Sequence, residues 1–406
     1  KIVGDNPLKQ VFPCLMLLVL FSPVGIDIYL PAIPRMQAVF SVTAAQIQLS
    51  LSLFVAAMGV SQIIVGPLAD KYGRRPVAIT GISLYLCCSL VIALSQTFSV
   101  LLIFRMLQGV GAGCTAIVAF TVVRDRFPPR EAATLYSYLN GTLSLVPALA
   151  PLMGGLLMNW LGWRSNFYFL ALFSTVVLWV VIRGLPESRP PESRPPESRP
   201  AETQSYQFFS WHRYRTILTD RRFAPYALSA MGAMSVVLSY AFFAPQVLMV
   251  ELGVSSKQFA LLFGLNALAI MAVSFAAPRV INRIGRRACV GLGSLLMLLS
   301  GVLMLLFFVF AEPSIIGYML PVALACCGFA LLLGPAASLA LEPFGDRAGT
   351  ASALQGCVQM LGGAITSMLA SLIPYGPIVA LSILMTGFGL YGLALRYFDR
   401  DRQKVL

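Results

Sequence analysis

Charged residues are scarce in this sequence. Asp, Glu, Lys and Arg make up only 11% of its 406 residues, against 58% hydrophobic residues. It has one histidine, His212, no C-x-x-C pair among its eight cysteines and no P-loop lysine. These absences leave almost no material for a histidine-based metal site, a catalytic triad or a nucleotide site. So little charge also excludes a water-soluble domain. We therefore expect no enzyme, no metal and no bound cofactor.

Long apolar runs make up most of the sequence. The mean hydropathy is +0.81, and runs of about 20 residues, enough to cross about 30 Å of hydrocarbon, recur along nearly the whole chain. The pattern predicts an integral membrane protein of the all-α class. The twelve expected spans are residues 10–32, 47–69, 76–95, 98–122, 134–160, 163–184, 223–250, 258–281, 288–310, 314–340, 347–373 and 375–396.

The lysines and arginines are concentrated in one set of loops. Of the 29 cations, only Arg35, Arg164 and Lys257 fall in the opposite loops, and Arg105 falls inside a span. Cytoplasmic loops accumulate Lys and Arg, so we expect a multi-pass protein of a bacterial inner membrane with both termini in the cytoplasm. The net charge of +13 then reflects orientation in the lipid bilayer, and nucleic acid is not an expected partner.

One long polar loop divides the chain. It contains "PESRPPESRPPESRP", three copies of a pentapeptide over residues 186–200, and this composition predicts an extended tether because it cannot bury apolar area. The following "WHRYRTILTDRR" (211–222) predicts a basic amphipathic stretch on the cytoplasmic membrane surface, attracted to anionic lipid headgroups. The expected units are a six-helix bundle at 10–184, a linker at 185–222 and a second six-helix bundle at 223–396.

The two halves of the chain echo each other. "GPLADKYGRR" (66–75) follows the second span, and "PRVINRIGRR" (278–287) follows the eighth. "RDRFPPR" (124–130) and "LEPFGDR" (341–347) follow the fourth and tenth spans. Two six-helix pseudo-repeats are what a carrier needs, because one half can rock against the other and expose a site at the membrane midplane to each side in turn.

Four motifs make the resemblance to a known family specific. Residues 66–75 resemble the loop 2–3 signature of the major facilitator superfamily, G-x-L-x-D-r-x-G-r-[rk]. "RMLQGVGA" (105–112) resembles the fourth-helix motif of its proton-coupled members. "PALAPLMGG" (147–155) resembles the fifth-helix antiporter motif, with Ala150 where many members carry glycine. Together with "GIDIYLPAIP" (25–34), the chain is similar to the bicyclomycin/chloramphenicol-resistance branch of the twelve-helix drug:proton antiporters.

The resemblance implies the major facilitator fold, with twelve transmembrane helices in two six-helix pseudo-repeats, and a proton gradient as the energy source. It implies gating roles for the loop signature, where Gly66 would allow close helix approach. Asp70 would hold one conformation either by lying at a helix N-terminus or by pairing with cytoplasmic arginines. The prolines and glycines of the fifth helix would bend it and let it pack tightly. Gating is expected from Gly66, Asp70, Gly73, Arg74, Arg75, Pro147, Pro151, Gly154 and Gly155.

Two further features concern the glycines of the fourth span and the second-half copy of the loop signature. Gly109, Gly111 and Gly113 of the fourth span form a G-x-G-x-G that predicts a close-packing face, since no P-loop lysine accompanies it. In the second half Asn282 occupies the position of Asp70. That copy of the loop therefore lacks the charge needed to hold a conformation.

Asp27 is the only carboxylate clearly inside a span, and Arg105 is the only cation. If the first span ends near Ala32, both residues lie at about the same depth, about 8–10 Å from the outer boundary. Ionisable residues in a membrane are functional candidates by default. We predict that Asp27 exchanges the proton and that Arg105 opposes its protonation when close. A structural salt bridge between the two is the alternative.

Other polar or aromatic residues of the spans are candidates for lining a substrate path. They are Tyr29, Gln108, Tyr138, Asn140, Tyr240, Gln246, Asn266, Gln355 and Gln359. We predict a proton-coupled exporter of small amphipathic drugs, such as chloramphenicol-like antibiotics, that works as a monomer. A dedicated exporter of one metabolite, such as an amino acid or siderophore, stays open as an alternative, and a small-solute importer or uniporter is a further one.

Overall fold

The computed structural model describes residues 7–127, 129–187 and 211–404, and in these ranges the chain is built from helices without strands. Eleven helical segments among the described residues are long and apolar enough to cross a membrane. The remaining expected span falls on α7 (Pro129–Leu161), whose 33 residues exceed the length a span needs. The predicted all-α membrane class is therefore confirmed.

The helices before the linker follow the predicted order. They are α1 (Pro7–Val19), α2 (Phe21–Asp27), η1 (Leu30–Ala32), α3 (Ile33–Phe40), α4 (Ala44–Tyr72), α5 (Arg74–Leu94), α6 (Phe98–Arg126), α7 and α8 (Arg164–Gly184). Those after it are α9 (Trp211–Leu218), α10 (Phe223–Ala244), the π-helix η3 (Pro245–Glu251), α11 (Ser256–Ile284), α12 (Arg286–Phe310), α13 (Ile315–Leu341), η4 (Glu342–Arg347), α14 (Ala348–Ala370) and α15 (Gly376–Lys404).

Helices α4 and α11 show that the two halves share local structure. Each has 29 residues and begins with a capping box, made by Thr43 with Gln46 in α4 and by Ser255 with its own glutamine in α11. Each ends at a glycine with positive φ, Gly73 at 101° and Gly285 at 83°. These side chains satisfy the free N–H groups of a helix start, and only glycine adopts the terminal conformation without strain.

Prolines interrupt the first span. Pro23 and Pro31 lack the N–H that would bond the carbonyls of Val19 and Asp27 four residues earlier, and the α-helix breaks between α1 and α2 and again after Asp27. The apolar segment nevertheless continues to Phe40. The helical segment thus extends beyond the expected end near Ala32, and Asp27 lies further from the end of that segment than the sequence suggested.

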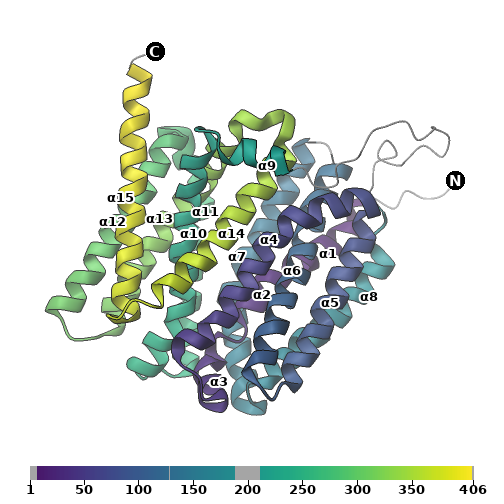
Figure 1. The fold of residues 1–406 in the computed structure, drawn as a ribbon, viewed down its shortest axis with the longest axis horizontal. Coiled ribbons are helices and arrows are strands. Elements are labelled where there is room, and N and C mark those ends of the chain that lie inside the picture. The colour runs from purple at the N-terminus through teal and green to yellow at the C-terminus, as the bar shows by residue number, and fades with distance from the viewer. Residues whose placement is uncertain (1–6, 128, 188–210, 405–406) are drawn as a thin grey trace.

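Figure 1 shows the helices of the first half on one side of the molecule and those of the second half on the other. The halves meet through two helix pairs, α4 with α14 and α7 with α11. The start of α1 and the end of α15 lie at the same end of the bundle. We call this the arginine-rich end, since Arg74, Arg126 and Arg286 belong to it. The exact division into domains at 10–184, 185–222 and 223–396 stays a prediction.

Helix α9 differs from its prediction. Its apolar face, with Tyr214 and Ile217, is buried against the protein rather than turned to lipid. It contacts α10 and α14 of the second half, while Arg215 points outward. A short amphipathic helix buries its apolar face wherever apolar area is available, and here the helix ends of the second half provide that area. The tether at 188–210 falls outside the described residues.

Candidate functional site

Asp27 is a buried carboxylate at the interruption of the first span. Its side chain is only 5% exposed. Its carboxylate takes part in none of the hydrogen bonds or ion pairs found in the described part of the chain. An unpaired charge inside a membrane costs several kcal/mol. The position therefore calls for a proton, a ligand cation or water.

Helix α7 packs closely against the backbone of the residue that follows Asp27. A Cβ on Gly154 would overlap the carbonyl oxygen of Ile28 and lie 2.6 Å from its carbonyl carbon. At the next position, a Cβ on Gly155 would meet Ser256 at an ordinary 3.6 Å. The tight packing expected of this glycine pair is thus found at Gly154, where the lack of a side chain lets two backbones touch.

Arg105 is fully buried at 0% exposure, and aromatic rings flank its charge. Its guanidinium carbon lies 4.6 Å from the ring centre of Tyr29 and 4.3 Å from that of Phe54. It donates to Gln108 Oε1 at 2.7 Å and to the Tyr29 hydroxyl at 3.3 Å. Cation–π contacts of a desolvated guanidinium contribute about 2 kcal/mol. Neutral groups thus stabilise this buried cation.

The hydrogen bonds around Arg105 extend through three helices. Gln108 Nε2 donates to Ser89 Oγ at 2.7 Å, and the Tyr29 hydroxyl lies 3.0 Å from Ser50 Oγ. We call Ser50, Tyr29, Ser89, Arg105 and Gln108 the Arg105 network. It ties the first span to α4, α5 and α6. Arg105 and Gln108, three residues apart on α6, lie on one helix face and bond each other.

The structure brings Arg105 to the interrupted segment that carries Asp27, but not into a salt bridge with it. Among the ion pairs of the described residues, none joins the two or gives Arg105 a carboxylate partner. Arg105 instead contacts Tyr29, two residues after Asp27. The structural salt bridge considered from the sequence is therefore not formed in this arrangement.

The second half presents an aromatic and polar surface to Asp27. Tyr240 of α10 lies within electrostatic range of Asp27. Its ring stacks on Phe263 with centroids 5.2 Å apart and 15° between planes, and Tyr318 lies 6.5 Å away. Asn266 Nδ2 donates to the Cys326 thiol at 3.2 Å. The charge of Asp27 thus acts across the two halves on this surface through Tyr240.

Several buried polar atoms near this surface lack a partner within the part of the chain that the structure describes. They are the hydroxyls of Tyr240 and Tyr318, Asn266 Oδ1 and both amide atoms of Gln355. Buried polar groups are nearly always satisfied. Unsatisfied donors and acceptors from α10, α11, α13 and α14 are what a polar ligand between the halves would use.

The predicted lining residues fall into distinct groups. Tyr29 and Gln108 belong to the Arg105 network, whereas Tyr240, Asn266 and Gln355 carry the unsatisfied atoms. Gln246 and Gln359 are half-buried on η3 and α14. The side chains of Tyr138 and Asn140 fall outside the described residues. Sequence reasoning missed Tyr318, since it lies near the start of its span, and Phe54, because an aromatic residue in an apolar helix carries no signal of its own.

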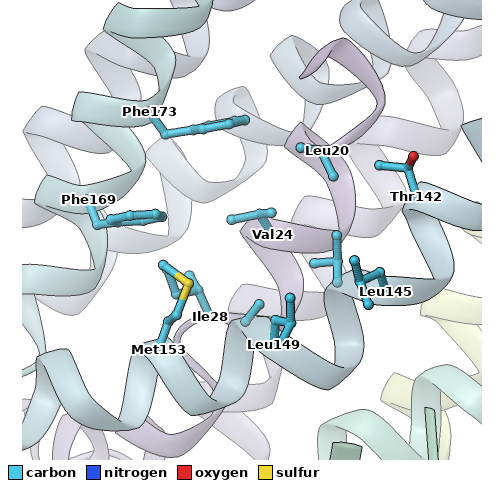
Figure 2. Close-up of a pocket in the computed structure, with 11 residues that line it drawn as sticks. Leu20, Val24, Ile28, Thr142, Leu145, Leu149, Met153, Phe169 and Phe173 are labelled. Atoms are coloured by element: carbon cyan, nitrogen blue, oxygen red, sulfur yellow. The ribbon is translucent and has the colours of Figure 1, made fainter. Parts of the chain in front are cut away.

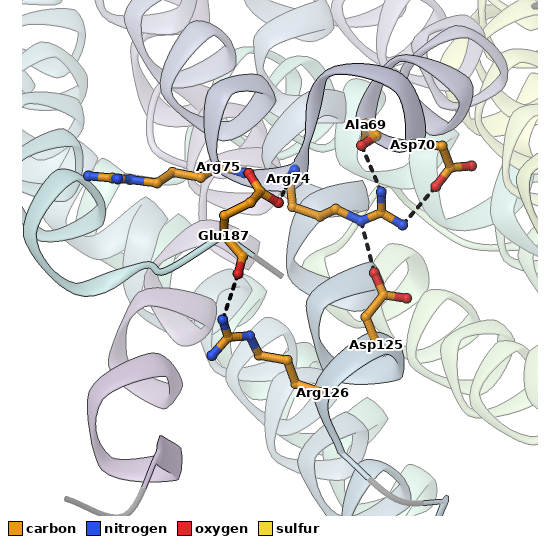
Figure 3. Close-up of polar contacts among 7 residues, drawn as sticks. All are labelled: Ala69, Asp70, Arg74, Arg75, Asp125, Arg126 and Glu187. Atoms are coloured by element: carbon orange, nitrogen blue, oxygen red, sulfur yellow. Dashed lines mark hydrogen bonds and ion pairs between the residues drawn. The ribbon is translucent and has the colours of Figure 1, made fainter. Parts of the chain in front are cut away.

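A second cluster lies at the arginine-rich end (Figure 3). Arg74 is 3% exposed and donates to Asp125 Oδ2 at 2.8 Å, to Asp70 Oδ1 at 2.7 Å and to the Ala69 carbonyl at 2.7 Å. We call Ala69, Asp70, Arg74 and Asp125 the Arg74 cluster. It joins the end of α4, the start of α5 and the end of α6. Asp70 does pair with an arginine, as expected, but the more buried carboxylate is Asp125.

Gly66 and Arg75 behave differently from each other within the loop signature. A Cβ on Gly66 would meet no atom of the described chain within 4 Å, so the close helix approach expected there is absent from this structure. Arg75 donates to the Ile182 carbonyl at 2.6 Å and thereby holds α8 to α5. In α6, close approach occurs at Gly109 and Gly113, against α4, and at Gly111, against α5.

Glu187, at the start of the linker, is bound to the loop signature. The Glu187 carboxylate accepts from the backbone N–H of Arg74 at 2.9 Å and of Arg75 at 3.2 Å, and its carbonyl accepts from Arg126 at 2.8 Å. A helix start carries unpaired N–H groups and positive partial charge. Glu187 therefore caps α5, and the tether begins only after it.

The corresponding loop of the second half is held less firmly. Arg286 pairs with Glu342 at 2.8 Å and Ser338 at 3.0 Å, but both charged side chains are largely exposed. Asn282 is exposed as well. The sequence difference between Asp70 and Asn282 thus coincides with a weaker cluster, since exposed ion pairs contribute about 0–1 kcal/mol.

An apolar groove lies on the outer surface of the first half (Figure 2). Val24 of α2 and Ile28 directly after α2 form its floor, with Phe169 and Phe173 of α8 on one side and residues of α7 such as Leu149 on the other. Its lining is apolar except for Thr142, whose hydroxyl donates to Met16. Such a groove can take hydrocarbon but not exchange a proton, so the coupling chemistry belongs to the Asp27 side of α2.

The chain matches the family model described as "Major Facilitator Superfamily" over residues 15–367. It is 32% identical over 363 residues to "Multidrug resistance protein MdtL" of Escherichia coli O139:H28 (strain E24377A / ETEC), which covers 89% of this chain and 88% of that protein. The protein of the same name from Shigella boydii serotype 18 (strain CDC 3083-94 / BS512) has the same identity and coverage.

Solved structures share the architecture at low identity. A POT family transporter in complex with thioalcohol-conjugated peptide superposes with a TM-score of 0.78 at 15% identity, covering 97% of this chain and 96% of that one. A D-xylose–proton symporter superposes with a TM-score of 0.75 at 16% identity, covering 97% of both. At these identities the likeness shows a shared fold.

Proposed function

Because the chain belongs to the major facilitator superfamily, a superfamily of membrane transporters, we propose that it is a proton-coupled antiporter that exports small amphipathic drugs by alternating access. The observation that carries this proposal is Asp27, a buried carboxylate without an ionic partner among the described residues, near the second half. The multidrug resistance proteins at 32% identity favour drugs as the substrate class.

The chemistry of coupling follows from the surroundings of Asp27. A charged carboxylate enclosed without a counter-charge is costly, so closing the site requires that Asp27 bind either a proton or a polar or cationic group of the substrate. The two compete for one carboxylate. Proton entry on one side of the membrane then releases substrate there, and substrate entry on the other side releases the proton, which is antiport.

Arg105 has a supporting part in this scheme. Its charge is already compensated by the rings of Tyr29 and Phe54 and by Gln108. It therefore holds the segment after Asp27 in place without neutralising the carboxylate. In another arrangement of the halves, a shift of Tyr29 would release a guanidinium group that attracts the Asp27 carboxylate.

Substrate recognition is assigned to the surface that faces Asp27. Tyr240 and Phe263 offer a stacked aromatic face, and the unsatisfied atoms of Asn266, Tyr318 and Gln355 offer hydrogen bonds. An amphipathic molecule has groups for both. With the arginine-rich end in the cytoplasm of a bacterium, as the distribution of cations favours, export runs away from that end, and the protein needs no partner beyond protons, substrate and lipid.

The test is gradient-driven uptake into proteoliposomes that contain purified, monodisperse protein and no ATP. With radiolabelled chloramphenicol and an imposed pH gradient, the wild type should accumulate drug. Asp27→Asn keeps size and polarity but cannot exchange a proton, so it should lose accumulation while keeping drug exchange at zero gradient. Glu312→Gln, an exposed carboxylate outside the spans, is the matched control and should transport normally. Accumulation by Asp27→Asn at the wild-type rate would remove Asp27 from the mechanism.

A further inference from the structure

One hydrogen bond between the two halves has no role in the proposed transport mechanism. The hydroxyl of Tyr214 in α9 donates to the backbone carbonyl of Ile63 in α4 at 3.4 Å. Helix α9 packs on α10 and α14 of the second half, whereas Ile63 belongs to the first. This single hydrogen bond therefore crosses from one half to the other near the arginine-rich end.

The Ile63 carbonyl is available because of Pro67. In an α-helix each carbonyl accepts from the N–H four residues later, and for Ile63 that residue is Pro67, inside α4. Proline has no N–H to donate. A carbonyl without a donor is costly at membrane depth, and neighbouring elements usually supply the missing donor. Tyr214 supplies it here from the other half.

The phenol is held firmly on the second half. Tyr214 is 7% exposed and Ile217, one turn later, is 0% exposed. Both pack in a cluster with Phe223, Phe344 and other residues of α10, η4 and α14, against which the side chain of Ile63 also packs. When the halves separate at this end, α9 must stay with this cluster, so the bond to Ile63 must break.

We propose that Tyr214 is a positioning residue for alternating access. Its hydroxyl stabilises the closed arginine-rich end by donating to the Ile63 carbonyl the hydrogen bond that Pro67, which has no N–H, does not supply. Separation of the halves leaves the carbonyl to water in the opened cleft. The contact thus favours one conformation without touching substrate or Asp27. This role goes beyond the proposed function, because it concerns the conformational equilibrium and holds for any transported compound.

The experiment measures the distance between the halves without substrate or gradient. Spin labels at Tyr72→Cys and Arg283→Cys, exposed ends of α4 and α11, report separation by electron–electron resonance in a Cys87→Ser background. Tyr214→Phe removes only the hydroxyl. Loss of one donor to a buried carbonyl should raise the population of long distances on the order of tenfold. An unchanged distance distribution would overturn the proposal.

A double-mutant cycle separates this role from general destabilisation. Pro67→Ala restores an N–H that satisfies Ile63 within α4, so Tyr214→Phe should have no further effect in that background. Pro278→Ala removes an interior proline from α11, which Tyr214 does not bond, and there Tyr214→Phe should keep its full effect. Equal effects of Tyr214→Phe in both proline backgrounds would refute the assignment.

A second measurement covers the case in which Tyr214→Phe does not yield monodisperse protein. Hydrogen exchange of the α9 amides should be faster in Pro67→Ala than in Pro278→Ala, because only in the former does an N–H of α4 already satisfy the Ile63 carbonyl, which weakens its bond to Tyr214. Equal exchange in the two variants would contradict the proposal. Since neither measurement involves transport, failure of the drug:proton scheme and failure of the Tyr214 assignment give separate results.

Discussion

Replacing Gly154 by alanine tests how α7 supports the segment after Asp27. The added Cβ would overlap the Ile28 carbonyl oxygen and lie 2.6 Å from the carbonyl carbon. To reach ordinary contact, the backbones of α7 and α2 must separate by about 1 Å, because neither partner is a flexible side chain. Overpacking of this kind costs about 1–3 kcal/mol, and this site should fall at the upper end.

Gly155→Ala is the matched control, since its Cβ would meet Ser256 at 3.6 Å and it changes the same helix by the same methyl group. We expect Gly154→Ala to unfold at a lower temperature than the wild type in detergent and to lose gradient-driven drug uptake, while Gly155→Ala changes neither. The displacement of Ile28 also moves Asp27, its direct neighbour. Equal melting temperatures and equal transport for the two variants would refute the argument.

Three further predictions concern the charged clusters. Asp125→Asn should lower thermal stability by about 1.5–3 kcal/mol because it removes the buried carboxylate partner of Arg74 and leaves the exposed Asp70 as its ion-pair partner, whereas Asp70→Asn, at a 63% exposed carboxylate, should cost under about 1 kcal/mol; equal melting curves would contradict this. Glu187→Gln should speed hydrogen exchange at the start of α5, since glutamine keeps one acceptor oxygen of the two and loses the negative charge, at a cost of about 1 kcal/mol; unchanged exchange would show that the cap is unimportant. Arg105→Lys should lower the melting temperature more than Arg164→Lys, because only Arg105 lies between two rings; the reverse order would exclude the cation–π argument.

The sequence predicted the fold because membrane spans follow from apolar length alone. Twenty apolar residues must form a helix in hydrocarbon, since no water satisfies the backbone there. The predicted major facilitator fold is confirmed by the comparisons and the helical architecture. The first helical segment runs past the expected end near Ala32, because Pro23 and Pro31 interrupt the helix without ending the segment.

The partners of the site residues were harder to predict. Opposite charges in a membrane suggest a salt bridge, but Arg105 is surrounded by Tyr29 and Phe54, whose ring faces carry no charge that sequence analysis would register. Similarly, the amphipathic pattern of α9 fixes which face is apolar but not whether lipid or protein covers it. The assignment of Asp27 and of the lining residues to function stays a prediction.

The three identical pentapeptides of the linker have an evolutionary consequence. Glu187 caps α5 from the copy next to α8. Because the copies are the same, loss or gain of any one unit, as happens when a polymerase slips on repeated DNA, leaves the residues adjoining α8 unchanged. The distance allowed between the two halves can therefore drift by steps of five residues over generations, while the attachment to the loop signature is inherited intact.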